Sequence, residues 1–173
     1  MPSFYGYHGT DMLLGEKIVE EKKFHLSLGD DHWLGDGIYF FEDHREALLW
    51  AKICRKFPTP VVIEVSIISD RVFDLTKIDD QIRFDEFIAV IESKLDNVKK
   101  EELRQQSKRK GIGGYINMLY KLEPFEVVRA VFNSHLRLKY IRSLMSSLSP
   151  AQIQLCVRGH SAILEDSIVV RRS

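Results

Sequence analysis

Apolar residues recur along this chain with two different spacings, one typical of strands and one typical of helices. Alternation between apolar and polar residues is clearest where Ile63, Val65 and Ile67 interleave with Glu64 and Ser66. The same criterion predicts strands over residues 4–8, 37–41, 61–68, 126–132, 152–158 and 163–170.

Helical spacing and capping residues predict the helices between these strands. Thr10 or Asp11 can cap a helix that runs to about residue 22, with Leu14 and Ile18 on one face. Asp43 can cap a second helix that ends before Pro58 and Pro60. Its predicted buried stripe is Ala47, Ala51 and Cys54.

The middle of the chain predicts a helical insertion over about residues 80–122. Phe84, Phe87, Ile88, Ile91 and Leu95 keep helical spacing, as do Tyr115, Met118, Leu119 and Leu122. Strands therefore come first and last, which favours an α+β fold with a mostly antiparallel sheet in a single domain, 1–173. The glycine-rich fingerprints of the common nucleotide-binding folds, GxGxxG and GxxxxGK[ST], are absent.

Composition narrows the class of protein. The 173 residues are 45% hydrophobic and 29% charged, which is ordinary for a soluble domain. Cys54 and Cys156 both lie in apolar patterns, so no disulfide framework is predicted and a reducing cytoplasm fits. We expect no signal peptide and no membrane helix. Asp30, Asp31, His32 and His44 match no zinc or calcium spacing, so no metal site is predicted.

The zero net charge hides an uneven distribution. Residues 1–90 carry 10 Lys and Arg against 17 Asp and Glu, while residues 91–173 carry 15 against 8. The two halves can simply attract each other, or the basic excess can form a face for a polyanion or an acidic partner. That excess includes Lys99, Lys100, Lys108, Arg109, Lys110, Arg137, Lys139, Arg142, Arg171 and Arg172.

Three short motifs carry candidate chemistry, and each is common when taken singly. They are Tyr7-His8-Gly9-Thr10, the segment from Trp33 to Phe40 with Gly37-Ile38-Tyr39-Phe40 at its end, and the strand from Gln152 to Arg158 followed by Ile163. Together and in this order they resemble the ADP-ribosyltransferase superfamily. The closer resemblance is to the branch of diphtheria toxin and the poly(ADP-ribose) polymerases, which is marked by a His, a Tyr and usually a Glu on three strands.

The resemblance implies a split sheet that binds NAD without a Rossmann fold. His8 would bond a hydroxyl of the nicotinamide ribose, the Gly9 backbone would pair with the carboxamide, and Tyr39 would stack on the nicotinamide ring. Thr10, Gln152 and Arg158 would complete the NAD site. Arg129 and Arg158 could bind the pyrophosphate, or pair with acids such as Asp36.

The third motif departs from the family, because a Gln stands where Glu is usual. We place Gln154 at that position, and Gln152, two residues earlier on the same strand, is the alternative. Alternation places Gln152, Gln154, Cys156 and Arg158 on one face of their strand. Gln can hold a ribose hydroxyl but cannot act as a general base. The catalytic set would then be His8, Tyr39 and Gln154. Glu165, Glu64 and Glu42 are the alternative carboxylates.

The segment 133–151 precedes the third motif, where the family contacts its acceptor. It can be a packed surface helix or an acceptor platform, in which case Arg137, Lys139, Tyr140 and Arg142 would bind a nucleic acid through phosphate pairing and stacking.

The sequence thus predicts a cytoplasmic mono-ADP-ribosyltransferase that passes ADP-ribose from NAD to a nucleic acid or protein. By analogy with small members of the superfamily, it would be a toxin or an anti-phage effector with a neutralising partner protein. Two alternatives stay open. One is a module that binds NAD or ADP-ribose without turnover, and the other is an RNA-binding protein whose motif match is chance.

Overall fold

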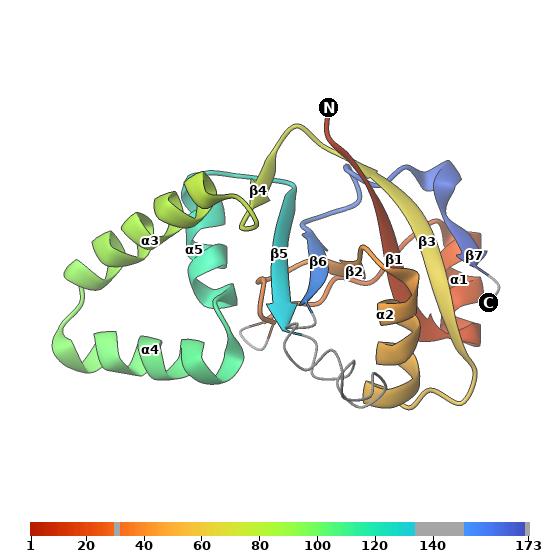
Figure 1. Cartoon of the computed structure of the whole chain (residues 1–173), viewed down its shortest axis with the longest axis horizontal. Helices are drawn as coiled ribbons and strands as arrows, with labels where there is room; N and C mark the ends of the chain where they lie inside the picture. The colour runs from red at the N-terminus through yellow and green to blue at the C-terminus, as the bar shows by residue number, and fades with distance from the viewer. Residues whose placement is uncertain (30–31, 134–150, 172–173) are drawn as a thin grey trace, which may run out of the picture.

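The computed structural model describes residues 1–29, 32–133 and 151–171. Its strands form one sheet of seven in the order β4-β5-β6-β2-β1-β3-β7, shown in Figure 1. They are β1 (Ser3–Asp11), β2 (Ile38–Phe41), β3 (Pro60–Ile68), β4 (Val72–Asp74), β5 (Val127–Asn133), β6 (Ala151–Val157) and β7 (Val169–Arg171). Only β4 and β5 pair in parallel among these strands. The predicted α+β fold with a mostly antiparallel sheet is confirmed.

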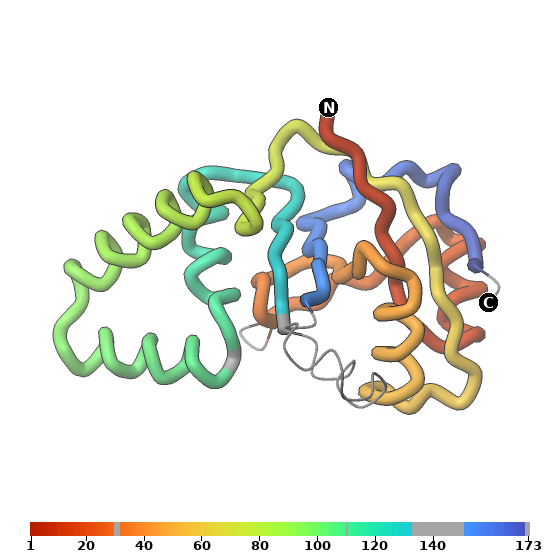
Figure 2. Tube along the Cα trace, viewed as in Figure 1, coloured from red at the N-terminus to blue at the C-terminus, as the bar shows by residue number. Residues whose placement is uncertain are grey.

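Helices flank the sheet and fill the long connection between β4 and β5. They are α1 (Met12–Glu21), α2 (His44–Leu49), the π-helical turn η1 (Trp50–Cys54), α3 (Ile78–Ser93), α4 (Asn97–Lys110), α5 (Gly113–Leu122) and the short 3-10 helix η3 (Glu165–Ser167). Figure 2 shows α3, α4 and α5 gathered on the β4 and β5 side, with α1 and α2 around β1 and β3. No helix in the described part of the chain is long and apolar enough to cross a membrane.

The capping residues explain where the first two helices begin. The Asp11 carboxylate accepts a hydrogen bond from the backbone N–H of Leu13, at 3.3 Å, and Asp43 does the same for Arg45, at 2.8 Å. Both aspartates have extended backbone angles, as expected for an N-cap. The two predicted helix starts are therefore confirmed.

Both faces of the sheet are covered, because successive strand residues point to opposite sides. On one face, Ile63, Val65 and Ile67 of β3 pack with Ile18 of α1. On the other, Val62 packs with Ala47 of α2, and farther along the sheet Val128 of β5 packs with residues of α3 and α5. This arrangement brings α2 and the helical insertion to the same face, with β2 and β6 between them.

Two predicted details of the elements are wrong. Ala47 and Ala51 are fully buried, but Cys54 is exposed. The reason is η1, where the Arg55 N–H bonds the Trp50 carbonyl and the wider turn moves later residues off the predicted stripe. Residues 163–170 do not form one strand either. Ile163 makes an isolated bridge to Ile67, and η3 separates it from β7.

Candidate active site

The sheet divides between β1 and β2, where the described residues make one paired position, Tyr7 with Phe41. By contrast, β1 pairs with β3 along its whole length, from Ser3 to Asp11. Beyond Tyr7 the two strands have no ladder between them. The seam opens at the ends of the first two motifs, His8-Gly9-Thr10 and Tyr39.

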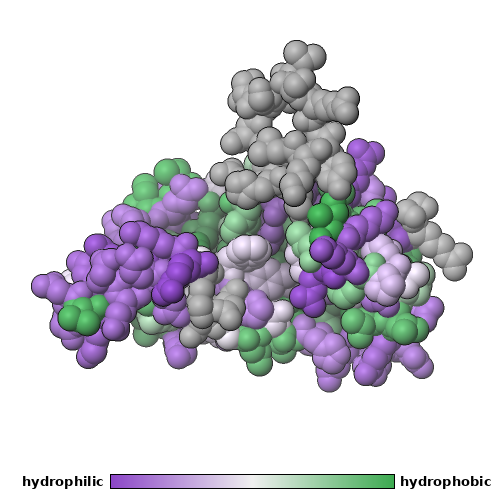
Figure 3. Space-filling view, turned by 90° about the horizontal axis from the view of Figure 1, so that it is seen from below, coloured by the Kyte–Doolittle hydropathy of each residue, from purple (hydrophilic) through white to green (hydrophobic). Residues whose placement is uncertain are grey.

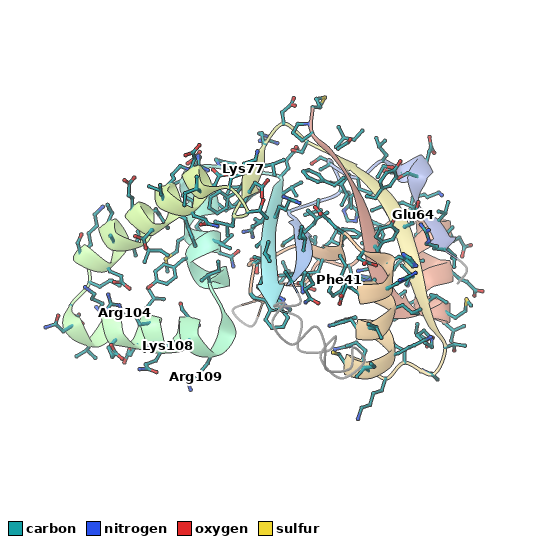
Figure 4. The ribbon with its side chains drawn as sticks, in the orientation of Figure 1. Phe41, Glu64, Lys77, Arg104, Lys108 and Arg109 are labelled. Carbon is teal, nitrogen blue, oxygen red and sulfur yellow. The ribbon has the colours of Figure 1, made fainter. Side chains whose placement is uncertain are left out.

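A cavity of about 290 Å³ occupies this opening, with an aromatic lining. Three strands contribute to it: His8 and Gly9 from β1, Tyr39 and Phe41 from β2, and Gln154 from β6. The lining is completed by Ser27, His32, Trp33, Trp50 and Arg55. The structure thus brings together the three residues predicted to be catalytic. Figure 4 labels Phe41, one of the residues that line the cavity, beside α2.

His8 connects the two sides of the seam. Its Nδ1 lies 2.8 Å from the backbone carbonyl of Tyr39. A carbonyl can only accept, so Nδ1 must carry the proton. The ring also meets Phe24 and Phe40 edge to face, at 5.4 and 5.8 Å between centroids. These surroundings disfavour the charged form and lower the pKa of His8 below its ordinary value. At neutral pH the ring is therefore neutral, with Nε2 as an acceptor.

The backbone of Gly9 points into the seam. The Met12 N–H bonds the Thr59 carbonyl at 2.8 Å, which fixes the even-numbered residues of β1 as those bonded to β3. Gly9 shares the orientation of Tyr7, which pairs with β2. Its N–H and C=O therefore face Tyr39 across the gap without a ladder partner. A flat amide can use such a donor and acceptor.

Packing against α2 also requires a glycine at position 9. A Cβ placed there would lie 2.2 Å from the carbonyl oxygen of Ala47 and 3.2 Å from the Cβ of Ala51. The first distance is shorter than real Cβ atoms show, and the second is tighter than most Cβ contacts. The close approach of α2 to β1 therefore requires Gly9, and it also brings Trp50 to the cavity.

Tyr39 presents its ring to the cavity while its hydroxyl is fixed in the preceding loop. The hydroxyl donates to the Gly35 carbonyl at 2.7 Å and accepts from the Leu34 N–H at 2.9 Å. Burial raises the pKa of Tyr39 above its ordinary value. The hydroxyl is thus occupied and un-ionised, which leaves the ring face as the part of Tyr39 available for a ligand.

The loop that carries His32 and Trp33 is held by Asn117 of α5 and by Arg158, which follows β6. The Asn117 side-chain oxygen accepts from the Asp36 N–H at 2.9 Å and from Arg158 Nη1 at 2.6 Å. Arg158 Nη1 also donates to the Asp36 carbonyl at 2.7 Å. Gly35 has a φ of +79°, a conformation that glycine adopts readily, so the chain can turn tightly at this residue.

Gln154 is almost fully buried, at 4% exposure, and lies opposite Phe41 on β2. Its carboxamide makes no hydrogen bond within the described part of the chain, so it is available to a ligand. Alternation places it with Cys156 on the face predicted from the sequence, while Leu155 and Val157 pack on the other.

None of the three alternative carboxylates lies at the cavity. Glu42 bonds Arg129 at 2.6 and 3.1 Å, Glu64 bonds Arg171, and Glu165 is exposed on η3. Asp and Glu are absent from the cavity lining among the residues that the structure describes. Among the described residues of the lining, His8 and His32 are the side chains that could accept a proton.

The other predicted NAD-site residues lie elsewhere. Thr10 is buried and lines a second cavity, of about 210 Å³, that shares His8 and Gly9 with the first. Gln152 is half-buried on β6 opposite Phe132 and does not line either cavity. Arg158 holds the 34–36 loop rather than the cavity. Arg137, Lys139, Tyr140 and Arg142 lie outside the described residues.

Arg129 is engaged in ion pairs, away from the cavity. It bonds Glu42 as described above, and its Nη1 lies 3.3 Å from the Asp74 carboxylate and 2.7 Å from the Thr76 hydroxyl. The carboxylates, Glu42 above all, raise the pKa of its guanidinium. Of the two arginines proposed for a pyrophosphate, Arg129 pairs with acids and Arg158 with carbonyls and an amide.

Sequence reasoning missed several residues of the lining, above all Trp50 and Arg55. Both follow the predicted second helix, and their positions depend on the π-helical turn. An aromatic-basic-aromatic sequence, Trp50, Arg55 and Phe57, is the signal that could have drawn attention to them.

The basic residues of α4 form a separate region of the molecule. Figure 4 shows Arg104, Lys108 and Arg109 on this helix, and Figure 3 shows a mostly hydrophilic surface over it. Arg104 and Lys100 pair with Glu92, at 2.6 and 3.8 Å. Much of this charge is therefore balanced locally. Among the described residues, no three His, Cys, Asp or Glu side chains gather as they would around a metal ion.

A comparison with known proteins gives the chain a relative. It is 32% identical to the "Uncharacterized protein MJ0359" of the archaeon Methanocaldococcus jannaschii, over 91% of this chain and 83% of that protein. The chain belongs to the same family as this archaeal protein. Because the match covers 91% of this chain, it includes more of the sequence than the strands alone. It brings no activity with it, because the relative is itself named as uncharacterized. No protein-family model and no solved structure matches the chain.

Proposed function

We propose that this protein is an NAD-dependent mono-ADP-ribosyltransferase. The observation that carries the proposal is the meeting of His8, Gly9, Tyr39 and Gln154, from three strands, around one aromatic cavity at the division of the sheet. The nicotinamide ring of NAD is flat and cationic, with a carboxamide on its edge. Aromatic faces suit such a ring, and a free backbone N–H and C=O suit the carboxamide.

Each site residue has a role that follows from its surroundings. The unprotonated Nε2 of His8 accepts a hydrogen bond from a hydroxyl of the nicotinamide ribose, because its Nδ1 is occupied by the Tyr39 carbonyl. The ring of Tyr39 stacks on nicotinamide, in an orientation fixed by the loop bonds of its hydroxyl. The Gln154 carboxamide holds a ribose hydroxyl, a contribution of about 0.5–1.5 kcal/mol.

The reaction breaks the bond between C1′ of the ribose and the nicotinamide nitrogen. The bonding electrons leave with nicotinamide, which becomes neutral, and the acceptor atom forms the new bond to C1′ and loses a proton. Gln154 cannot take that proton. We therefore propose an acceptor that is already nucleophilic, or a base supplied by the acceptor or by another residue, and a single transfer rather than chain building.

The acceptor proposed is a macromolecule, either nucleic acid or protein, in the cytoplasm. A role as a toxin or anti-phage effector, with a neutralising partner protein, is part of the same proposal. The second candidate function is a module that binds NAD or ADP-ribose without turnover. It is favoured by the lack of a carboxylate in the described lining of the cavity.

The test uses NAD labelled on its adenylate phosphate, incubated with the protein and a cell lysate. Tyr39→Ala removes the stacking ring, and Tyr5→Ala is the control because Tyr5 is 63% exposed at the far end of β1. We expect label in a macromolecule with the wild type and Tyr5→Ala but not with Tyr39→Ala. Digestion with nuclease or protease then identifies the acceptor class.

Three other results would each change the conclusion. NAD binding without labelling or release of nicotinamide would favour the non-catalytic module. An absence of NAD binding, together with salt-sensitive RNA binding that Tyr39→Ala leaves unchanged, would favour an RNA-binding protein. Labelling that persists in Tyr39→Ala would mean that the reaction does not take place in this cavity.

A further inference from the structure

One cation lies where the two neighbouring cavities meet. Arg55 follows the π-helical turn η1 and lines both the 290 Å³ cavity and the 210 Å³ cavity beside it. The two cavities also share His8, Gly9, Ser27 and Trp50. They are therefore adjoining parts of one depression, and a ligand long enough to enter both would pass Arg55.

The guanidinium of Arg55 is positioned by two aromatic rings. Its Cζ lies 5.6 Å from the centroid of Trp50 and 5.5 Å from that of Phe57. The backbone of this segment is also fixed, since the Arg55 N–H bonds the Trp50 carbonyl and the Phe57 N–H bonds the Ala51 carbonyl, both at 3.1 Å. Cation–π contacts orient a guanidinium while its N–H groups stay free for other partners.

The charges around Arg55 favour an anion. Within the described residues, Arg55 has no acidic partner, whereas Arg129 pairs with Glu42 and Asp74. Lys17 and Lys23 also line the second cavity. Glu21 is the one acidic residue in its described lining, and it lies 3.7 Å from Lys17. The second cavity therefore carries an excess of positive charge, while the first has no carboxylate in its described lining.

We propose that Arg55 binds the diphosphate of a dinucleotide that spans both cavities. This inference rests on the proposed function, in which the nicotinamide end occupies the cavity at Tyr39. The planar guanidinium can donate two parallel hydrogen bonds to phosphate oxygens, a geometry that a lysine cannot reproduce. The nucleoside at the other end then lies in the second cavity, among Trp50, Phe57 and Thr10.

The test measures binding of ADP and adenosine by calorimetry, without any turnover. Arg55→Gln removes the charge and Arg55→Lys keeps it without the fork. Lys52→Gln is the control, because Lys52 is exposed on the same turn and lines neither cavity. We expect Arg55→Gln to weaken ADP binding by about 10- to 100-fold, Arg55→Lys to weaken it less, and adenosine binding to stay unchanged.

Several outcomes would overturn the assignment of Arg55. These are equal ADP affinity in Arg55→Gln and wild type, an equal loss of adenosine and ADP affinity, and a wild type that binds no ADP. The labelling experiment separates this inference from the proposed function. If no ADP-ribose is transferred but ADP binding depends on Arg55, the diphosphate site is supported and the proposed transferase activity is contradicted.

Discussion

The Nδ1 of His8 donates a hydrogen bond of 2.8 Å to the backbone carbonyl of Tyr39, across the place where the sheet divides. A side chain of β1 thus donates a hydrogen bond to a backbone carbonyl of β2 that faces the seam. The bond fixes the tautomer of His8, and it leaves the Gly9 N–H and C=O opposite Tyr39 without ladder partners. Two site residues are therefore coupled before any ligand binds.

The first prediction concerns the pH dependence of stability. The pKa of His8 is lowered in the folded state, so the unfolded chain binds more protons between that value and the ordinary 6.5. The contribution of His8 to stability is complete above pH 6.5 and is lost as the pH falls. We expect the free energy of unfolding to fall more steeply for wild type than for His8→Gln between about pH 7.5 and 5, measured by urea unfolding. Equal slopes would contradict the prediction.

The second prediction concerns the close approach of α2 to β1. Gly9→Ala places a Cβ 2.2 Å from the Ala47 carbonyl, so the helix must move away from the strand. We expect a loss of about 1–3 kcal/mol in the free energy of unfolding, as for other overpacked sites, together with weaker NAD binding. Gly114→Ala is the matched control. A Cβ there meets nothing within 4 Å, and alanine favours a helix by up to about 1 kcal/mol.

The third prediction concerns the anchoring of the loop behind Tyr39. Asn117→Ala removes the acceptor shared by Arg158 and the Asp36 N–H, although Asn117 does not line the cavity. We expect a loss of stability of about 1–3 kcal/mol and weaker NAD binding, because the loop also carries His32 and Trp33. A double-mutant cycle with Arg158→Gln should show coupling, since each change removes the same interaction. Additive effects would mean that the two residues act separately.

The fourth prediction concerns the missing carboxylate. Gln154→Glu introduces a base into the 290 Å³ cavity without a large change of shape. A carboxylate about 4 Å from the developing positive charge stabilises it by up to about 4 kcal/mol at an effective dielectric near 20. We expect release of nicotinamide from NAD to rise by about tenfold or more, measured with water as the acceptor. Gln152→Glu, on the same strand but outside the cavity, is the control and should leave the rate unchanged.

The local parts of the fold could be predicted from the sequence because they depend on neighbouring residues. Alternation of Ile63, Val65 and Ile67 with polar residues marks β3, since one face of the strand is buried. Cys54 was predicted to be buried and is exposed, because its position depends on a change of helix type rather than on its neighbours in the sequence. The π-helical turn η1 follows directly on α2, and residue spacing alone does not reveal it.

The position of the candidate-site residues could be predicted in part, and the reason is physical. The resemblance of short motifs singled out His8, Tyr39 and Gln154, and alternation along the strand gave the face of Gln154. The arginines depend on partners that are distant in sequence. Arg129 forms ion pairs with Glu42 and Asp74, and Arg158 donates a hydrogen bond to Asn117. Arg55 instead contacts the rings of Trp50 and Phe57 and lines the cavities. Nothing in the spacing of these arginines distinguishes the three.

The open seam between β1 and β2 gives the protein a built-in reporter. His8 and Thr10 direct their amides to β3, while Gly9 directs its amide into the gap. In the free protein the Gly9 amide should therefore exchange its hydrogen with solvent faster than the amides on either side of it. A carboxamide bound in the seam would slow exchange at that one position, so a single backbone amide can be used to follow occupancy of the site.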